Sequence, residues 1–319
     1  MKLSVIIPVY NVEAYVGKTL ASVFNTTAPT DAFEVIVVND GTQDGSMEVV
    51  RKFSDRPNIT ILEQGNQGLG AARMNGLALA KGEYVWFVDS DDYLVTDGVG
   101  KVLHLLEERK DADVLMFPLL RVEEDASGNW LDLDVDGERV VEGRKVIKEL
   151  GLSVSTSQRF VLKRSLTDNP WLFFPAGLIH EDEYFGPVLM CLAKCVHILS
   201  EPVYCHTCYR PGSIMSSLSV RSSYDMVSVH QLLMRFMESN LDPEDHPWFR
   251  SYAFRRLLKS YSRSVRNCGA SEINRFVRQH GRYVWDQWRR ANPEAPLRKK
   301  AGRFLYFTKP ALYTKWIHR

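Results

Sequence analysis

The sequence lacks any long apolar segment. Its first apolar stretch, residues 3–9, is short and is interrupted at Pro8, so it is typical of neither a signal peptide nor a membrane span. No later stretch approaches the ~20 apolar residues that a helix needs to cross a bilayer. These absences predict a cytoplasmic protein without a transmembrane helix.

Cysteine is also scarce, with five residues in a chain of 319. An odd number of cysteines without an export signal favours reduced thiols over disulfides. Four of them fall between residues 191 and 208, but only Cys205 and Cys208 have the two-residue gap of a zinc knuckle. We therefore expect free thiols rather than a zinc site.

Net charge is nearly absent, because 40 Lys and Arg residues against 39 Asp and Glu residues give +1. This balance provides no general electrostatic attraction to nucleic acid, and we recognise no nucleic-acid-binding fold in the sequence. Hydrophobic residues at 45% and charged residues at 25% are typical of a soluble globular protein and exclude wholesale disorder. We expect no nucleic-acid partner.

Positive charge nevertheless collects near the C-terminus, where cationic and aromatic residues are interleaved. Such a segment suits an anionic membrane surface, where each cation adds ~1 kcal/mol, and would place the protein at the inner face of the plasma membrane. The same pattern is typical of helices that pack through their aromatics and expose a basic face, and both interpretations remain open. The residues are Trp285, Trp288, Arg289, Arg290, Arg298, Lys299, Lys300, Arg303, Phe304, Leu305, Tyr306, Phe307, Lys309, Tyr313, Lys315 and Trp316.

Short β-rich runs alternate with helical patterns through the first hundred residues. Strands joined by helices form right-handed crossovers, so we expect an α/β fold with a Rossmann-like, mostly parallel central sheet flanked by helices. Strands are expected at residues 3–8, 33–39, 59–63 and 84–88, and helices at 12–25, 46–53 and 68–80.

The pattern changes along the rest of the chain. After residue 216 long helical patterns dominate, which predicts an α/β domain at residues 1–215 and a helical C-terminal extension at 216–319. The other expected elements are a helix at 97–110, a strand at 114–120, a surface insertion or hairpin at 123–143, and helices at 184–193, 227–237 and 248–265.

Three carboxylates follow the fourth predicted strand, in the sequence Asp89-Ser90-Asp91-Asp92. Like charges this close repel one another unless a cation neutralises them. Carboxylate oxygens suit Mg²⁺ or Mn²⁺, and such an ion can bridge to the phosphates of a nucleotide. The alternative is a solvated acidic turn before the next helix, with Asp92 or Thr96 as the N-cap.

Two further motifs lie at comparable places in the predicted sheet. Asp40 follows the second strand, where its carboxylate can accept the imide hydrogen of uracil or bond to ribose hydroxyls, although Asp-Gly is also a common turn. The glycine-rich stretch 64–76 enters a helix, and its amides and Arg73 are suited to a diphosphate. It lacks the lysine and hydroxyl of a P-loop and does not follow the first strand, which weakens ATPase and dehydrogenase interpretations.

In this order the motifs resemble the signature of family 2 glycosyltransferases, which are inverting enzymes with the GT-A fold. The matching stretches are residues 4–11, 38–41, 65–76 and 88–92. The resemblance is close over about residues 1–120 and looser to about residue 220. Four motifs in order are far more specific than any one of them.

The resemblance implies a donor site for a nucleoside diphosphate sugar, with UDP favoured, and a divalent ion, Mn²⁺ or Mg²⁺, bound by Asp91 with Asp89. It also implies that residues 209–215 close over the diphosphate, although a Pro-Gly turn explains that stretch as well. The implied donor-binding residues are Pro8, Val9, Tyr10, Asp40, Gly68, Arg73, Asp89, Ser90, Arg210 and Ser213.

Glu181-Asp182, with Phe185 three residues further on, resembles the acidic pair that supplies the family's catalytic base. By this resemblance Asp182 is the general base and Glu181 is its catalytic neighbour. A carboxylate is needed because the acceptor hydroxyl loses a proton as it attacks the anomeric carbon, opposite the departing nucleoside diphosphate. An acidic helix start explains the same residues without catalysis.

The implied acceptor is a hydroxyl of a glycan or lipid-linked glycan, by analogy a bacterial surface-polysaccharide precursor. A nucleotidyltransferase is an alternative, but it normally carries a glycine-rich basic loop where this chain has Pro8-Val9-Tyr10-Asn11. A non-catalytic nucleotide-sugar-binding protein of the same fold is a second alternative, which the presence of Asp91 and Asp182 disfavours.

Overall fold

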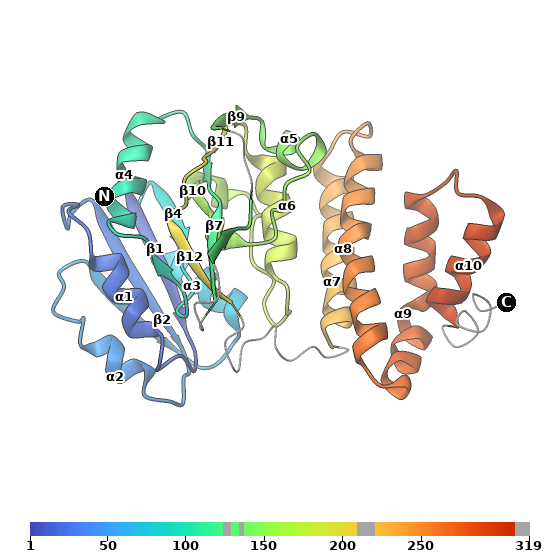
Figure 1. Cartoon of the computed structure of the whole chain (residues 1–319), viewed down its shortest axis with the longest axis horizontal. Helices are drawn as coiled ribbons and strands as arrows, with labels where there is room; N and C mark the ends of the chain where they lie inside the picture. The colour runs from blue at the N-terminus through green and yellow to red at the C-terminus, as the bar shows by residue number, and fades with distance from the viewer. Residues whose placement is uncertain (124–128, 134–136, 209–220, 310–319) are drawn as a thin grey trace. The chain divides into compact units, whose positions relative to one another are not determined.

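The computed structural model describes residues 1–123, 129–133, 137–208 and 221–309. The chain divides into two compact units, Met1–Pro211 and Gly212–Arg319. The first unit combines strands and helices, whereas the described part of the second is helical (Figure 1). The boundary expected between residues 215 and 216 falls outside the described residues.

The first unit is built on an eight-stranded sheet with the order β3-β2-β1-β4-β10-β6-β11-β9. The strands β3, β2, β1 and β4 run parallel, β10 is antiparallel to both of its neighbours, and β9 is antiparallel to β11. This arrangement confirms the mostly parallel sheet. The strands are β1 (Leu3–Val9), β2 (Phe33–Asp40), β3 (Ile59–Gln64), β4 (Tyr84–Phe87), β6 (Val114–Met116), β9 (Arg139–Val141), β10 (Phe160–Lys163) and β11 (Val196–Ile198).

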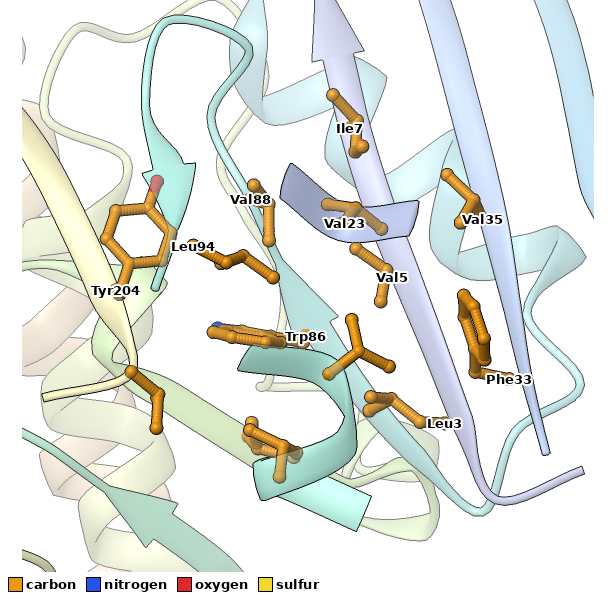
Figure 2. Close-up of a cluster of buried hydrophobic side chains, with 14 of the residues drawn as sticks. Leu3, Val5, Ile7, Val23, Phe33, Val35, Trp86, Val88, Leu94 and Tyr204 are labelled. Atoms are coloured by element: carbon orange, nitrogen blue, oxygen red, sulfur yellow. The ribbon is translucent and has the colours of Figure 1, made fainter. Parts of the chain in front are cut away.

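Helices cover both faces of this sheet, which explains why β1 and β2 are buried along their whole length. On one face, Figure 2 shows Leu3, Val5 and Ile7 of β1 with Val23 of α1, and α1 and α4 complete this core. On the other face α3 lies close to the sheet. The helices of this unit are α1 (Val16–Phe24), α2 (Ser46–Arg51), α3 (Leu69–Leu79), α4 (Gly98–Glu108), α5 (Gly143–Lys148) and α6 (Asp182–Leu192), with short 3₁₀ turns at Ser157–Arg159 and Arg164–Asp168.

The close approach of α3 requires the glycine at its centre. A Cβ added to Gly76 would lie 2.5 Å from Cγ2 of Ile6 on β1 and 3.1 Å from Cγ2 of Val38 on β2. Any larger residue would push the helix away from the sheet. Part of the glycine-rich motif therefore serves packing rather than ligand contact.

The single strand expected at residues 114–120 is wrong, because the structure has two strands in different sheets. β6 ends at Met116, and Leu119 begins β7 (Leu119–Glu123) of a small second sheet with the order β5-β12-β7-β8. Pro118 lies between them and has no N–H to continue the ladder, so the chain leaves the first sheet there. The other strands of this sheet are β5 (Tyr93–Leu94), β8 (Asn129–Leu131) and β12 (Tyr204–Cys208).

The second unit contains four described helices in sequence: α7 (Arg221–Asn240), α8 (His246–Asn267), α9 (Ala270–Ala291) and α10 (Leu297–Thr308). Each packs against the next, and the helical character agrees with the sequence pattern. No described helix is both long enough and apolar enough to span a bilayer.

Aromatic residues of α9 and α10 pack against one another. The rings of Trp285 and Trp288 stack at 5.2 Å between centroids, and Phe304 meets Trp285 edge-on at 5.5 Å. Trp288 and Phe307 are buried. These contacts agree with the packing interpretation of the basic aromatic segment, whereas membrane contact stays a prediction. Tyr313, Lys315 and Trp316 lie outside the described residues.

Candidate functional site

Several predicted donor residues, including Pro8, Val9 and Asp40, lie where parallel strands end at one edge of the sheet. β1 is paired with β2 and with β4, and Val9 lies opposite Asn39. The side chains of Pro8 and Val9 are buried, whereas Tyr10 just beyond them is 42% exposed. Tyr10 is therefore the residue of this turn whose side chain is available to a ligand.

Arg73 on α3 connects the acidic cluster to the start of α6. Its Nη2 lies 2.7 Å from Oδ1 of Asp89, and its Nη1 lies 2.6 Å from Oε1 of Glu181. The side chain is fully buried, with the guanidinium 5.0 Å from the centroid of the Phe174 ring. Three segments distant in sequence thus meet at one guanidinium.

The two carboxylates decide the charge of Arg73. Burial by itself lowers the pKa of Arg73, but Asp89 and Glu181 outweigh it, and with a further contribution from Asp182 they raise the pKa above its ordinary value. The guanidinium therefore stays charged. A direct contact between Arg73 and a sugar-nucleotide donor stays a prediction. The observed role of Arg73 is to hold Asp89 and Glu181 in place through these ion pairs.

The second carboxylate oxygen and the backbone N–H of Asp89 also have hydrogen-bond partners. The side-chain amide of Gln158 donates to Oδ2 of Asp89, and the backbone N–H of Asp89 donates to the hydroxyl of Tyr204 at 3.1 Å. Gln158 and Tyr204 belong to no motif and were not expected at the site. Only the fold brings them there, since they lie 69 and 115 residues away in the sequence.

Asp92 is buried and anchors β12. It accepts hydrogen bonds from the Tyr204 hydroxyl at 2.6 Å and from the backbone N–H of Thr207 at 2.8 Å. Burial, followed by the charges of Asp91 and Asp89, raises the pKa of Asp92 well above its usual range. The alternative that Asp92 or Thr96 is the N-cap of the next helix is wrong, because Asp97 occupies that position at the start of α4.

The acidic cluster has the donor set of a hard divalent cation. One oxygen from each of Asp89, Asp91 and Asp92 lies within 4.8 Å of the others. Carboxylate oxygens are the ligands that Mg²⁺ and Mn²⁺ prefer, and three of them gather here. Asp91 is half-buried, Ser90 is buried, and the carbonyl of Ser90 lies 2.9 Å from the Thr19 hydroxyl.

Asp40 holds the glycine-rich loop against the end of β2. Its Oδ1 accepts from the Gln64 side chain at 2.8 Å and from the Gln67 N–H at 2.7 Å, and its Oδ2 accepts from the Gly68 N–H at 2.9 Å. Gly68 has φ +87°, a conformation that glycine adopts without steric cost. Contact between Asp40 and a nucleotide base stays a prediction, and the loop clamp is its observed role.

The predicted catalytic pair begins α6. Glu181 is buried and forms its ion pair with Arg73. Asp182, the first residue of the helix, is half-buried. His180 just before them has φ +73°, an uncommon conformation for a residue with a side chain. Carboxylates in the first turn are favoured by the helix dipole, so this position alone does not assign a base.

Two predicted donor residues, Arg210 and Ser213, lie outside the described residues. None of the five cysteines, all of which the structure describes, forms a disulfide. Among the residues that the structure describes, the cysteine grouped with other possible metal ligands is Cys195, with Asp111 and His197 rather than with the other cysteines.

Comparisons with known proteins show which sequences this chain is similar to. A family model described as glycosyl transferase family 2 matches residues 4–166. The poly(ribitol-phosphate) beta-N-acetylglucosaminyltransferase TarS of Staphylococcus aureus is 30% identical over 236 residues, which cover 73% of this chain and 40% of TarS. The putative glycosyltransferase EpsH of Bacillus subtilis is 28% identical over 251 residues, which cover 76% of this chain and 71% of EpsH.

Solved structures show the same fold at lower identity. S. aureus TarS 1–349 in complex with UDP-GlcNAc has a TM-score of 0.66 at 20% identity, covering 98% of this chain and 92% of that one. The mannosyltransferase PcManGT from Pyrobaculum calidifontis, in complex with GDP-Man and Mn²⁺, has a TM-score of 0.55 at 15% identity, covering 100% of this chain and 88% of that one. These likenesses identify the fold as GT-A.

Proposed function

The chain belongs to glycosyl transferase family 2, and on this premise we propose that it transfers a sugar from a nucleoside diphosphate sugar to a hydroxyl of a glycan or lipid-linked glycan. UDP is the favoured nucleotide, because the TarS fragment with the same fold binds UDP-GlcNAc. The observation that carries the proposal is the buried bridge from Asp89 through Arg73 to Glu181, which joins the predicted donor residues to the predicted catalytic pair.

The donor would lie along the edge where β1, β2 and β4 end. Tyr10 is exposed there and offers an aromatic face to the base, and Asp40 holds the glycine-rich loop in place at the same edge. Asp91, with Asp89, would hold Mn²⁺ or Mg²⁺. When bound, such an ion supplies positive charge that stabilises the departing diphosphate.

Asp182 would act as the general base. Its neighbour Glu181 is fixed by Arg73, and this contact places the start of α6 beside the acidic cluster. A half-buried carboxylate at this point can take the proton of an acceptor hydroxyl during attack on the anomeric carbon. The result would be a single displacement with inversion.

Donor and metal binding are tested by thermal shift. UDP with Mn²⁺ should raise the melting temperature, by an amount equivalent to ~2.7 kcal/mol at a hundredfold excess over Kd. Asp91→Ala should abolish the metal-dependent part of the shift, whereas Asp55→Ala, which removes an exposed carboxylate, should retain it. If neither UDP nor GDP moves the wild type at millimolar concentration, the proposed donor site is wrong.

The role of Asp182 is tested by separating binding from turnover. Asp182→Asn should keep the UDP-dependent thermal shift and lose about 10²–10⁴-fold in transfer rate, because loss of a general base affects the chemical step. Glu183→Gln is the matched control on the same turn of α6, and its transfer rate should stay within a few-fold of the wild type. Undiminished turnover in Asp182→Asn would remove this residue from the mechanism.

A further inference from the structure

The second unit contains a pocket of about 290 Å³ among α7, α8 and α9. Each helix contributes one arginine to its lining: Arg235 from α7, Arg250 from α8 and Arg290 from α9. Glu238 is the one acidic residue in the lining, so positive charge is in excess. All of the lining residues belong to this unit.

The three pocket arginines have few partners in the described part of the chain. Among the residues that the structure describes, none of the three forms an ion pair, and the Nε of Arg250 is buried without a hydrogen-bond partner. Arg289, adjacent to Arg290, has its guanidinium 3.8 Å from Asp286 outside the pocket lining. Guanidinium groups gathered around a cavity without carboxylate partners are suited to an anionic ligand.

Uncharged polar groups complete the lining. Gln287 is only 8% exposed, and within the described part of the chain its side-chain amide has no hydrogen-bond partner. The hydroxyl of Tyr283 lies 2.8 Å from Nδ1 of His230. Burial, together with the charge of Arg250, lowers the pKa of His230 to about 3, so this histidine is neutral at physiological pH. The buried amide is a group for which a ligand hydroxyl would provide the missing partner.

Size and chemistry together define the class of ligand. The pocket volume is near the lower end of the volumes of small-molecule binding sites. Inorganic phosphate would therefore leave much of the pocket empty. Phosphate oxygens match the fork of a guanidinium, and neighbouring hydroxyls match Gln287 and Tyr283. We propose that this pocket binds a phosphorylated polyol or sugar, with Arg235, Arg250 and Arg290 around the phosphate. The inference rests on the second unit alone and does not depend on the proposed transfer reaction.

The test is calorimetric titration of the full chain, with saturating UDP and Mg²⁺ present so that the donor site is filled. Glycerol 3-phosphate and ribitol 5-phosphate should bind, free glycerol should not, and inorganic phosphate should bind at least tenfold more weakly than the phosphopolyols. Arg235→Gln with Arg290→Gln changes two exposed residues and should weaken phosphopolyol binding by tenfold or more. Arg289→Gln, a control on the same helix, should change it less than twofold.

Each other outcome contradicts the proposal. Equal weakening by Arg289→Gln would indicate general charge attraction, and equal affinity for inorganic phosphate would indicate an anion site without polyol recognition. Sedimentation with phosphatidylglycerol vesicles that is lost in the double variant, without binding of soluble phosphopolyols, would assign the pocket to a lipid surface. UDP-dependent stabilisation should persist in the double variant, so failure here leaves the donor-site hypothesis intact.

Discussion

The two units of this protein differ in how their arginines are partnered. In the first unit, Arg73 is enclosed and each end of its guanidinium fork meets a carboxylate, Asp89 or Glu181. In the second, the pocket arginines have no ion-pair partner among the described residues. Compensated charge fixes the geometry of the protein itself, whereas uncompensated charge around a cavity is a means of attracting a ligand.

The largest effect on stability is expected where the charge is compensated. Arg73→Met should destabilise the first unit by about 3–5 kcal/mol, because it leaves the carboxylates of Asp89 and Glu181 without their shared partner in a poorly solvated site. Urea denaturation measures this change. Arg73→Lys should recover only part of the loss, since an ammonium cannot reproduce the two-pronged contact.

The matched control for Arg73 is an ion pair at the surface. Lys2→Met breaks the contact of Lys2 with Glu83, whose side chain is 47% exposed, and should cost no more than ~1 kcal/mol. If Arg73→Met is as mild as Lys2→Met, the bridge does not organise the site.

An effect that develops gradually over a pH range is expected beside the pocket. Because the folded protein lowers the pKa of His230 from 6.5 to about 3, the unfolded chain binds a proton in this interval that the folded chain does not. Stability should therefore be full above about pH 6.5 and fall as the pH decreases toward 3, with a slope of at most ~1.4 kcal/mol per pH unit.

His230→Gln should make this acid dependence shallower, which urea denaturation at a series of pH values measures. His104→Gln, a substitution on the exposed face of α4, is the control and should leave the slope unchanged. An identical slope in wild type and His230→Gln would mean that other groups determine the acid sensitivity of the second unit.

Much of the donor edge was predictable because it follows from local pattern. Apolar strands alternating with helices predict a parallel sheet, and in such a sheet the carboxyl ends of the strands meet at one edge. Asp40 and the cluster Asp89 to Asp92 were placed at strand ends by this reasoning, and they occur there. The GT-A fold followed from the order of the motifs and is confirmed by comparison.

The contacts of individual site residues were less predictable. The sequence suggested that Asp40 and Arg73 face a ligand, but their observed partners are a loop and two carboxylates. Tyr204 joins Asp89 to Asp92 without belonging to a motif, because its position depends on how β12 packs in the second sheet. The break at Pro118 was missed because apolarity continues on both sides of it.

By itself, the sequence determined the fold class, the family and the edge of the sheet where the acidic groups collect, since periodicity and motif order are local properties of the chain. Only the tertiary structure decided which hydrogen-bond donor meets which hydrogen-bond acceptor. A guanidinium 16 residues from one carboxylate and 108 from another acquires both partners through packing. For the same reason the three arginines of α7, α8 and α9 line a common pocket only because these helices pack together.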